Sequence, residues 1–299
     1  MASFRSAKAK ASHALRPLVA HGAPRHAAKD DGKIHSLGTE RGYTVALAGV
    51  QKWLDSIKGG DVKRISTGVA MDYLMQRAAV VSQKTLDLDR QALQAVTGAK
   101  LTRVSAHRTG GRLATVTRSY TTAQVKEIAA GQSDRYALAT LIAHSAGLRA
   151  HELITILPAV ERCASQHREW SSNRFAGREG QVYTVIGKGG LITEKILPPE
   201  LAARLEARRL DVPQQVRDRG VNYQRHYDLA GGKKWSGDFS RASRDVLGYS
   251  TGGHGLRHAY AQERETELQS RGYTLSEARG IVAQEMGHFS SATTRSYER

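Results

Sequence analysis

Six side chains in the second half of the chain combine the groups needed to attack a phosphodiester without a metal ion. They comprise two arginines, one lysine, two histidines and a late tyrosine, namely Arg149, Lys188, His254, Arg257, His288 and Tyr297. A tyrosine hydroxyl can act as a nucleophile, arginines can hold a charged phosphate, and histidines can donate hydrogen bonds or move protons. The residue types therefore indicate phosphoryl transfer to a tyrosine.

The chemistry of tyrosine and arginine suits the roles of nucleophile and activating charge. A phenol has an unperturbed pKa of about 10, so Tyr297 needs positive charge or a base nearby when it attacks phosphorus. Arg149 and Arg257 can each grip non-bridging phosphate oxygens through planar, bidentate contacts. Each arginine would supply on the order of 3 kcal/mol of transition-state stabilisation, which other nucleases obtain from a metal ion.

These residues lie in short motifs that occur in a defined order. The motifs are GLRAHEL at 147–153, GKGG at 187–190, HGLR at 254–257 and GH at 287–288, followed by Tyr297. Together they resemble the tyrosine recombinase (phage-integrase) family, whose signature is an Arg in a GLRxxEL context, a Lys on a β-hairpin, HxxR, GH and a late Tyr. The resemblance covers roughly residues 120–299 by motif and the preceding eighty or so more loosely.

The resemblance also implies a role for each catalytic residue. Tyr297 is the nucleophile, the two arginines hold the phosphate, and Lys188 is the general acid that protonates the departing 5′-oxygen. His254 and His288 match the two histidine-type positions that orient the phosphate and assist proton movement. We expect no cofactor and no metal ion in this chemistry.

The resemblance further implies the fold, the reaction and the partners. It implies a mainly α fold with a small antiparallel β-sheet, in which a helical core-DNA-binding domain precedes the catalytic domain. The expected enzyme is a site-specific recombinase or integrase of a mobile genetic element, which cleaves and rejoins DNA through a 3′-phosphotyrosine intermediate. We expect double-stranded DNA as partner, a homotetramer on two DNA sites, no membrane, and a place in the bacterial cytoplasm, at the nucleoid when bound. Accessory DNA-bending or directionality factors are compatible with this interpretation.

Three other interpretations of the same residues stay open. A type IB topoisomerase shares the Arg–Lys–Arg–His–Tyr chemistry and would relax supercoils without a defined site. A non-catalytic DNA-binding protein could carry an inactive site. His254 and His258, four residues apart, could bind zinc together with His288, although no HExxH motif is present and the single cysteine, Cys163, is remote in sequence.

The charge distribution favours a polyanionic partner. The 299 residues carry a net charge of +17, and most of the excess lies in the first 118 residues. Residues 1–37 contain seven Lys/Arg and two Asp, and residues 38–118 contain thirteen Lys/Arg and six Asp/Glu. Nucleic acid is the first candidate and an acidic membrane surface the second. A lone cysteine excludes a disulfide framework, and no apolar run reaches the roughly 18 residues of a membrane span.

Helical periodicity divides the first part of the chain into a tail and a small helical module. Residues 1–37 lack periodicity and are expected to be a basic, flexible tail, although Met1–Lys29 could also be read as a transit peptide. Residues 38–103 predict a helical core-DNA-binding domain with helices over Thr39–Lys58, Thr67–Ala79 and Gln83–Val96, the last stopped by Gly98. Candidate DNA contacts in this module are Arg77, Lys84 and Arg90.

The second part of the chain predicts a linker and the catalytic domain. Residues 104–118 are rich in Gly, Arg and Thr and indicate a linker before a catalytic domain over 119–299. The expected elements are helices over Gln124–Ala130, Arg135–Ser145 and Glu200–Leu210, a hairpin of Gln181–Ile186 with Leu191–Leu197, and a helix capped at Thr274. Residues Tyr260–Gly272 make the interval between the HxxR and GH motifs longer than in the compact family pattern. We expect a charged helix with an added loop there. Many members of the family continue after the tyrosine into a C-terminal segment that docks on a neighbouring protomer. The sequence given ends two residues after Tyr297. If that segment is missing, we expect the protomers to be coupled through another surface.

Overall fold

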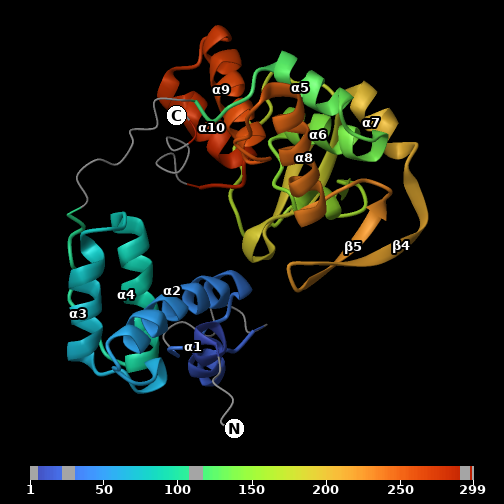
Figure 1. Cartoon of the computed structure of the whole chain (residues 1–299). Coiled ribbons are helices and arrows are strands. Elements are labelled where there is room, and N and C mark those ends of the chain that lie inside the picture. Colours follow the sequence, from blue (N-terminus) through green and yellow to red (C-terminus); the bar gives the residue numbers. More distant parts are fainter. Residues whose placement is uncertain (1–5, 22–30, 108–116, 290–296, 298–299) are drawn as a thin grey trace. The chain divides into compact units, whose positions relative to one another are not determined.

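The computed structural model describes residues 6–21, 31–107, 117–289 and 297, which form two compact units (Figure 1). The helical unit comprises Met1–Leu113, and the unit that contains the predicted catalytic residues, named the catalytic unit after them, comprises Ala114–Arg299. The division falls inside the expected linker, of which residues 108–116 lie outside the described residues. The prediction of a mainly α fold with small antiparallel sheets is confirmed.

The helical unit is built from helices that begin at serine caps. Its helices are α1 (Ala7–Leu15), α2 (Leu37–Ser56), α3 (Thr67–Ala78) and α4 (Gln83–Thr97). The side chains of Ser36, Ser66 and Ser82 each accept a hydrogen bond from a backbone N–H in the first turn of α2, α3 or α4. Gly98 ends α4 in the left-handed conformation, which glycine adopts without a steric penalty. The three predicted helices are confirmed to within a few residues.

Helix α1 corrects the prediction of an unstructured segment over residues 1–37. Ser6 caps α1, a 3-10 turn follows over Arg16–Leu18, and residues 1–5 and 22–30 lie outside the described residues. Ala11 and Leu15 are buried in the same core as α2. The segment is rich in alanine, which favours helix but supplies only a narrow apolar stripe, so no periodicity marked it.

Several helices of the catalytic unit begin or end at local sequence signals. Its helices are α5 (Thr122–Ala130), α6 (Asp134–Ala146), α7 (Pro199–Glu206), α8 (Gly232–Leu247), α9 (Gly255–Ser270) and α10 (Leu275–Glu285). Capping boxes open α5 at Thr121 and α10 at Thr274. Helix α9 continues unbroken to Ser270, so most of the long interval after the HxxR motif is helix.

In the described part of the catalytic unit, two antiparallel sheets accompany the helices. The first has the order β1 (Leu157–Pro158), β2 (Gln181–Ile186), β3 (Ile192–Leu197) and contains the predicted hairpin. The second is a long hairpin of β4 (Arg209–Asp218) and β5 (Val221–Tyr227), clearly visible in Figure 1. The predicted helix over Glu200–Leu210 is wrong after Glu206, because the chain turns at Ala207 and enters β4. Pro213 and a register shift in β4 break the alternation that would have revealed this strand.

Apolar packing joins these elements into a core around the motif residues. Helix α6 contributes Leu138 and Ile142, the first sheet Val185 and Leu197, and α8 the ring of Trp235. A second apolar cluster gathers side chains of α9 and α10 and includes Tyr297. Within the described ranges, no helix has the length and apolar character required to cross a bilayer.

Candidate active site

Arg149 lies on the turn that follows α6 and is held by the carboxylate of Glu152. Its Nη1 donates to Oε1 of Glu152 at 2.6 Å, and its backbone N–H donates to Oε2 at 2.8 Å. Gly147 makes the turn in the left-handed region at φ +60°, and a Cβ there would lie 2.7 Å from the Tyr260 ring. The motif therefore needs both the glycine, for the turn, and the glutamate, for the orientation of the arginine.

Glu152 is the anionic centre of the site. The carboxylate is fully buried, and burial alone would raise its pKa, but the positive charges of Arg257, Arg149 and Lys195 lower the pKa to about 2. Opposite charges within a few ångströms favour the ionised form more strongly than desolvation opposes it. Glu152 thus stays ionised and fixes the cations around it.

Arg257 lies in the first turn of α9 and is completely buried. Its guanidinium donates to the carbonyl of Gly147 and, at 3.1 Å, to the carbonyl of Met286. Nη1 lies 3.7 Å from Oε2 of Glu152. These carbonyls end α6 and α10, where helix dipoles present negative charge, so they help to offset the burial of a cation. Arg257 therefore joins the segments that carry Arg149 and His288.

His288 follows the last turn of α10 and contacts Arg149 directly. Gly287 reverses the chain at φ +71°, and Nη2 of Arg149 lies 2.7 Å from Nε2 of His288. A guanidinium can only donate, so Nε2 accepts and the ring proton resides on Nδ1. Burial and the charges of Arg257 and Arg149 lower the pKa of His288 to about 3, which keeps the ring neutral. Nδ1 is buried and has no hydrogen-bond partner among the described residues.

Tyr297 lies against the histidines and Arg257. Its ring centroid is 4.8 Å from that of His258, 5.4 Å from His254 and 5.7 Å from His288. The guanidinium carbon of Arg257 is 5.8 Å from the same centroid. The backbone carbonyl of Tyr297 accepts hydrogen bonds from Gln262 and His258, at 2.8 and 3.1 Å. Five of the six predicted catalytic residues are thus connected by direct contacts.

A pocket of about 240 Å³ opens beside these residues. Arg149, His254 and Arg257 line it together with His151 and Arg219. His254 is exposed at the first turn of α9, yet partial burial and the charge of Arg257 lower its pKa to about 4. The pocket therefore presents guanidinium groups and neutral imidazoles, a combination suited to an anion.

Lys188 occupies the turn between β2 and β3, as predicted, and is exposed. No described residue forms a hydrogen bond or ion pair with its ammonium group. The turn itself lies close to the site, because a Cβ on Gly187 would be 3.5 Å from Oε1 of Glu152 and 4.0 Å from Nη1 of Arg149. The role of Lys188 stays a prediction.

A buried network behind the site was not predicted. Lys195 of β3 is buried and donates to the backbone carbonyl of Glu285, the last residue of α10. Burial lowers the pKa of Lys195 to about 7, although Glu152 opposes this shift. The Glu285 carboxylate accepts from Tyr260 at 2.7 Å and pairs with buried Arg264 at 3.0 Å. This network fixes the end of α10, from which Gly287 and His288 emerge, and no motif marked it.

Among the described residues, the histidines of the site do not assemble with other metal-ligating groups. His254 and His258 have ring centroids 5.5 Å apart. No group of three or more His, Cys, Asp or Glu side chains arranged to hold a metal ion occurs in the part of the chain that the structure describes.

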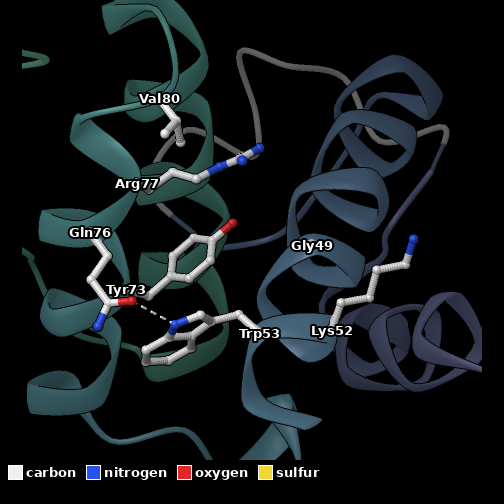
Figure 2. Close-up of a pocket in the computed structure, with 7 residues that line it drawn as sticks. All are labelled: Gly49, Lys52, Trp53, Tyr73, Gln76, Arg77 and Val80. Carbon is white, nitrogen blue, oxygen red and sulfur yellow. Dashed lines mark hydrogen bonds between the residues drawn. The ribbon is translucent and has the colours of Figure 1, made fainter. Parts of the chain in front are cut away.

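The three predicted DNA contacts of the helical unit lie in different environments. Lys84 is exposed near the start of α4. Arg90 donates to the side chain of Gln94 and the carbonyl of Leu101, which favours a structural role. Arg77 pairs with Asp89 at 3.3 Å and lines a pocket of about 460 Å³ with Trp53 and Tyr73 (Figure 2). All three stay predictions as DNA contacts.

Solved structures share the fold of this chain. A structure of the XerH site-specific recombinase bound to palindromic difH substrate, a post-cleavage complex, matches with a TM-score of 0.51 and 15% identity over 87% of this chain and 76% of that chain. A pre-cleavage complex of XerH with difH substrate matches with a TM-score of 0.51 and 13% identity over 98% of this chain and 93% of that chain. No protein-family model and no curated protein matches the sequence. The chain therefore has the fold of a tyrosine recombinase, as its motifs predict.

Proposed function

We propose that the protein is a site-specific DNA recombinase that cleaves and rejoins strands through a 3′-phosphotyrosine intermediate. The observation that carries the proposal is the position of Tyr297, within 5.8 Å of the rings of His254, His258 and His288 and of the Arg257 guanidinium. A tyrosine beside a buried arginine and neutral imidazoles is suited to attack on a phosphodiester, and it has little use in a protein that only binds DNA.

The reaction follows from the placement of charge. The Tyr297 oxygen bonds to phosphorus while the bond to the 5′-oxygen breaks, and Arg149 and Arg257 stabilise the additional negative charge. His254 takes the tyrosine proton, since its side chain lies near the Tyr297 ring and is exposed to water. Lys188 gives a proton to the 5′-oxygen. A 5′-hydroxyl of another strand reverses these steps, so strands are exchanged without an external energy source.

Duplex DNA is the proposed partner, bound by both units as a homotetramer on two sites. The excess of positive charge in the first 118 residues supports a phosphate-dominated interaction. Exposed Lys84 is one proposed contact of the helical unit. The pocket that Arg77 lines is the other (Figure 2).

Covalent trapping tests the proposal. Nicked suicide duplexes built on repeats that flank the coding sequence are incubated with the protein and resolved on a denaturing gel. We expect the wild type to form an adduct, also in excess EDTA. Tyr297→Phe should form at least a thousandfold less adduct, because the variant lacks the attacking oxygen. DNA affinity should be unchanged in the variant.

Each alternative predicts a different gel. An adduct that persists in Tyr297→Phe would exclude this tyrosine as nucleophile, and cleavage that needs zinc or magnesium would favour a metal site. Relaxation of supercoiled plasmids without any repeat would indicate a topoisomerase. Specific binding with no adduct on any repeat would indicate a DNA-binding protein with an inactive site.

A further inference from the structure

The β4–β5 hairpin brings an additional arginine to the catalytic pocket. Arg219 and Gly220 are the two residues between the strands, and their φ angles are +50° and +83°. Two consecutive left-handed residues make a type I′ turn, which Asn-Gly and Gly-Gly form with least strain. An arginine in the first position accepts backbone strain, and its side chain lines the pocket beside Arg149 and Arg257.

The tip of this hairpin is fixed to the segment that carries Arg149. Asp218 accepts a hydrogen bond from the backbone N–H of Lys233, in the first turn of α8, at 2.8 Å. A Cβ on Gly232 would lie 2.6 Å from Cγ of Asp218, so only glycine permits this approach. The N–H of Gly232 donates in turn to the carbonyl of Ala150 at 2.6 Å. The turn that carries Arg219 is therefore fixed by the contact of the Asp218 carboxylate with the first turn of α8, and α8 is in turn bonded to the Arg149 segment.

The charge of Arg219 is available to a ligand. In the described ranges no carboxylate forms an ion pair with it, whereas Arg149 is paired with Glu152. None of the described residues that line the pocket is acidic. His151, packed near Tyr223 of β5, adds an imidazole whose pKa is lowered by partial burial, with Arg149 and Arg219 contributing. The pocket thus has three guanidinium groups and no acidic wall.

We propose that Arg219 is a third phosphate-binding arginine, which contacts the phosphodiester seated between Arg149 and Arg257. The proposal rests on the proposed function for the identity of that phosphodiester as the scissile one. Arginine matches the geometry of a phosphate through two parallel N–H donors, which a lysine cannot supply. Arg219 therefore adds to the charge that faces the transition state.

The first test uses inorganic phosphate as the probe, so it needs no cleavage. Phosphate is titrated at constant ionic strength into the full-length protein, and binding is followed by ³¹P line broadening. We expect Arg219→Gly to weaken binding about tenfold. Arg217→Ala removes the same charge from an exposed position two residues earlier, outside the pocket, and should match the wild type. Glycine relieves the positive φ, so the Tm of Arg219→Gly should equal or exceed that of the wild type.

The second test identifies the phosphate contacted in DNA. Affinity is measured for a duplex with an ordinary scissile phosphate and for one with an uncharged methylphosphonate there. Arg219→Gly should weaken binding about tenfold on the charged duplex and by less than twofold on the uncharged one, and Arg219→Lys should restore only part of the loss.

Two outcomes would overturn the assignment. Equal phosphate binding by Arg219→Gly and Arg217→Ala would reduce Arg219 to a surface charge, and an undiminished defect on the methylphosphonate duplex would place its contact at another phosphate. If the wild type forms no adduct but phosphate binding still depends on Arg219, the proposed function fails and the anion site stands.

Discussion

Each unit buries a carboxylate beside an arginine, and the two carboxylates behave in opposite ways. In the helical unit, burial raises the pKa of Asp89, and the charge of Arg77 reverses this only in part. In the catalytic unit, burial acts on Glu152 in the same direction, but Arg257, Arg149 and Lys195 lower its pKa to about 2. The number of cations around the carboxylate decides whether the native state favours its ionised form, as at Glu152, or disfavours it, as at Asp89.

The difference extends to the composition of the two cores. Among the described residues of the helical unit, Asp89 is the one buried charged side chain, and the rest of the core is apolar apart from the polar residues Thr44 and Gln51. The catalytic unit buries a connected set that includes Glu152, Lys195, Arg257, Arg264 and Glu285. Such a set is costly to desolvate, and it holds the groups of the site in one arrangement only while it is complete.

Neutralising each buried carboxylate should give the largest contrast between the units. We expect Glu152→Gln to destabilise the catalytic unit by about 3–5 kcal/mol, since it leaves Arg149 and Arg257 without their anion. Asp89→Asn should cost the helical unit at most about 1 kcal/mol, because Arg77 is partly exposed and can bind water. Hydrogen exchange of peptides from each unit, measured in urea, separates the two effects. Equal losses in the two variants would show that the charge network adds nothing to the catalytic unit.

The pH dependence of the same two variants should have opposite signs. The folded-state pKa of Glu152 is lowered, so its stabilisation is present above the unfolded value of about 4.5 and is lost as pH falls toward 2. The deficit of Glu152→Gln should therefore shrink by roughly 2 kcal/mol between pH 7 and pH 3. The folded-state pKa of Asp89 is raised, so on acidification the folded unit binds the proton at a higher pH than the unfolded chain does. The stability of the wild type should therefore rise relative to that of Asp89→Asn as pH falls. Urea unfolding at both pH values checks these signs, and parallel profiles would contradict them.

Two helix-ending glycines should respond differently to the same substitution. The φ angle is +68° at Gly98 and +60° at Gly147. A Cβ on Gly98 would have no atom within 4 Å, whereas a Cβ on Gly147 would lie 2.7 Å from the Tyr260 ring. We expect Gly98→Ala to cost about 1 kcal/mol from backbone strain and Gly147→Ala about 3 kcal/mol, because overpacking adds to it. Gly147→Ala should also slow adduct formation, since the Gly147 carbonyl holds Arg257. Thermal unfolding measures the loss of stability, and the adduct assay measures the rate of adduct formation. If Gly147→Ala destabilises the protein no more than Gly98→Ala does, the Tyr260 ring moves freely.

The smallest effects should come from charges on the helical unit. We expect Lys84→Ala to lower the slope of log affinity against log salt by about 0.9 on a random duplex, with unchanged stability. Arg90→Ala should leave that slope unchanged and destabilise the unit by about 1–2 kcal/mol, because its donors bond to Gln94 and Leu101. Binding isotherms at several salt concentrations decide this. A slope that falls with Arg90→Ala would restore this arginine as a DNA contact.

Sequence patterns predicted those parts of the fold that depend on near neighbours. The capping box at Thr274 and the glycine stop at Gly98 act within one helical turn, so the helix ends that they mark could be predicted. Helix α1 was not predicted, because alanine favours helix but gives no apolar face with a clear periodicity. The β4–β5 hairpin escaped because Pro213 interrupts its pattern, although Asp218-Arg219-Gly220 before an alternating run was a usable turn signal.

By itself, the sequence determined which chemical groups are available to the candidate site, because the motifs around Arg149, Arg257, His288 and Tyr297 are local and ordered along the chain. Only the tertiary structure decided how these groups are charged and which others join them. The neutrality of His288, the ionisation of Glu152 and the presence of Arg219 in the pocket depend on burial and on charges contributed by distant segments. Desolvation and Coulomb interactions act over distances in space, which the order of residues does not specify.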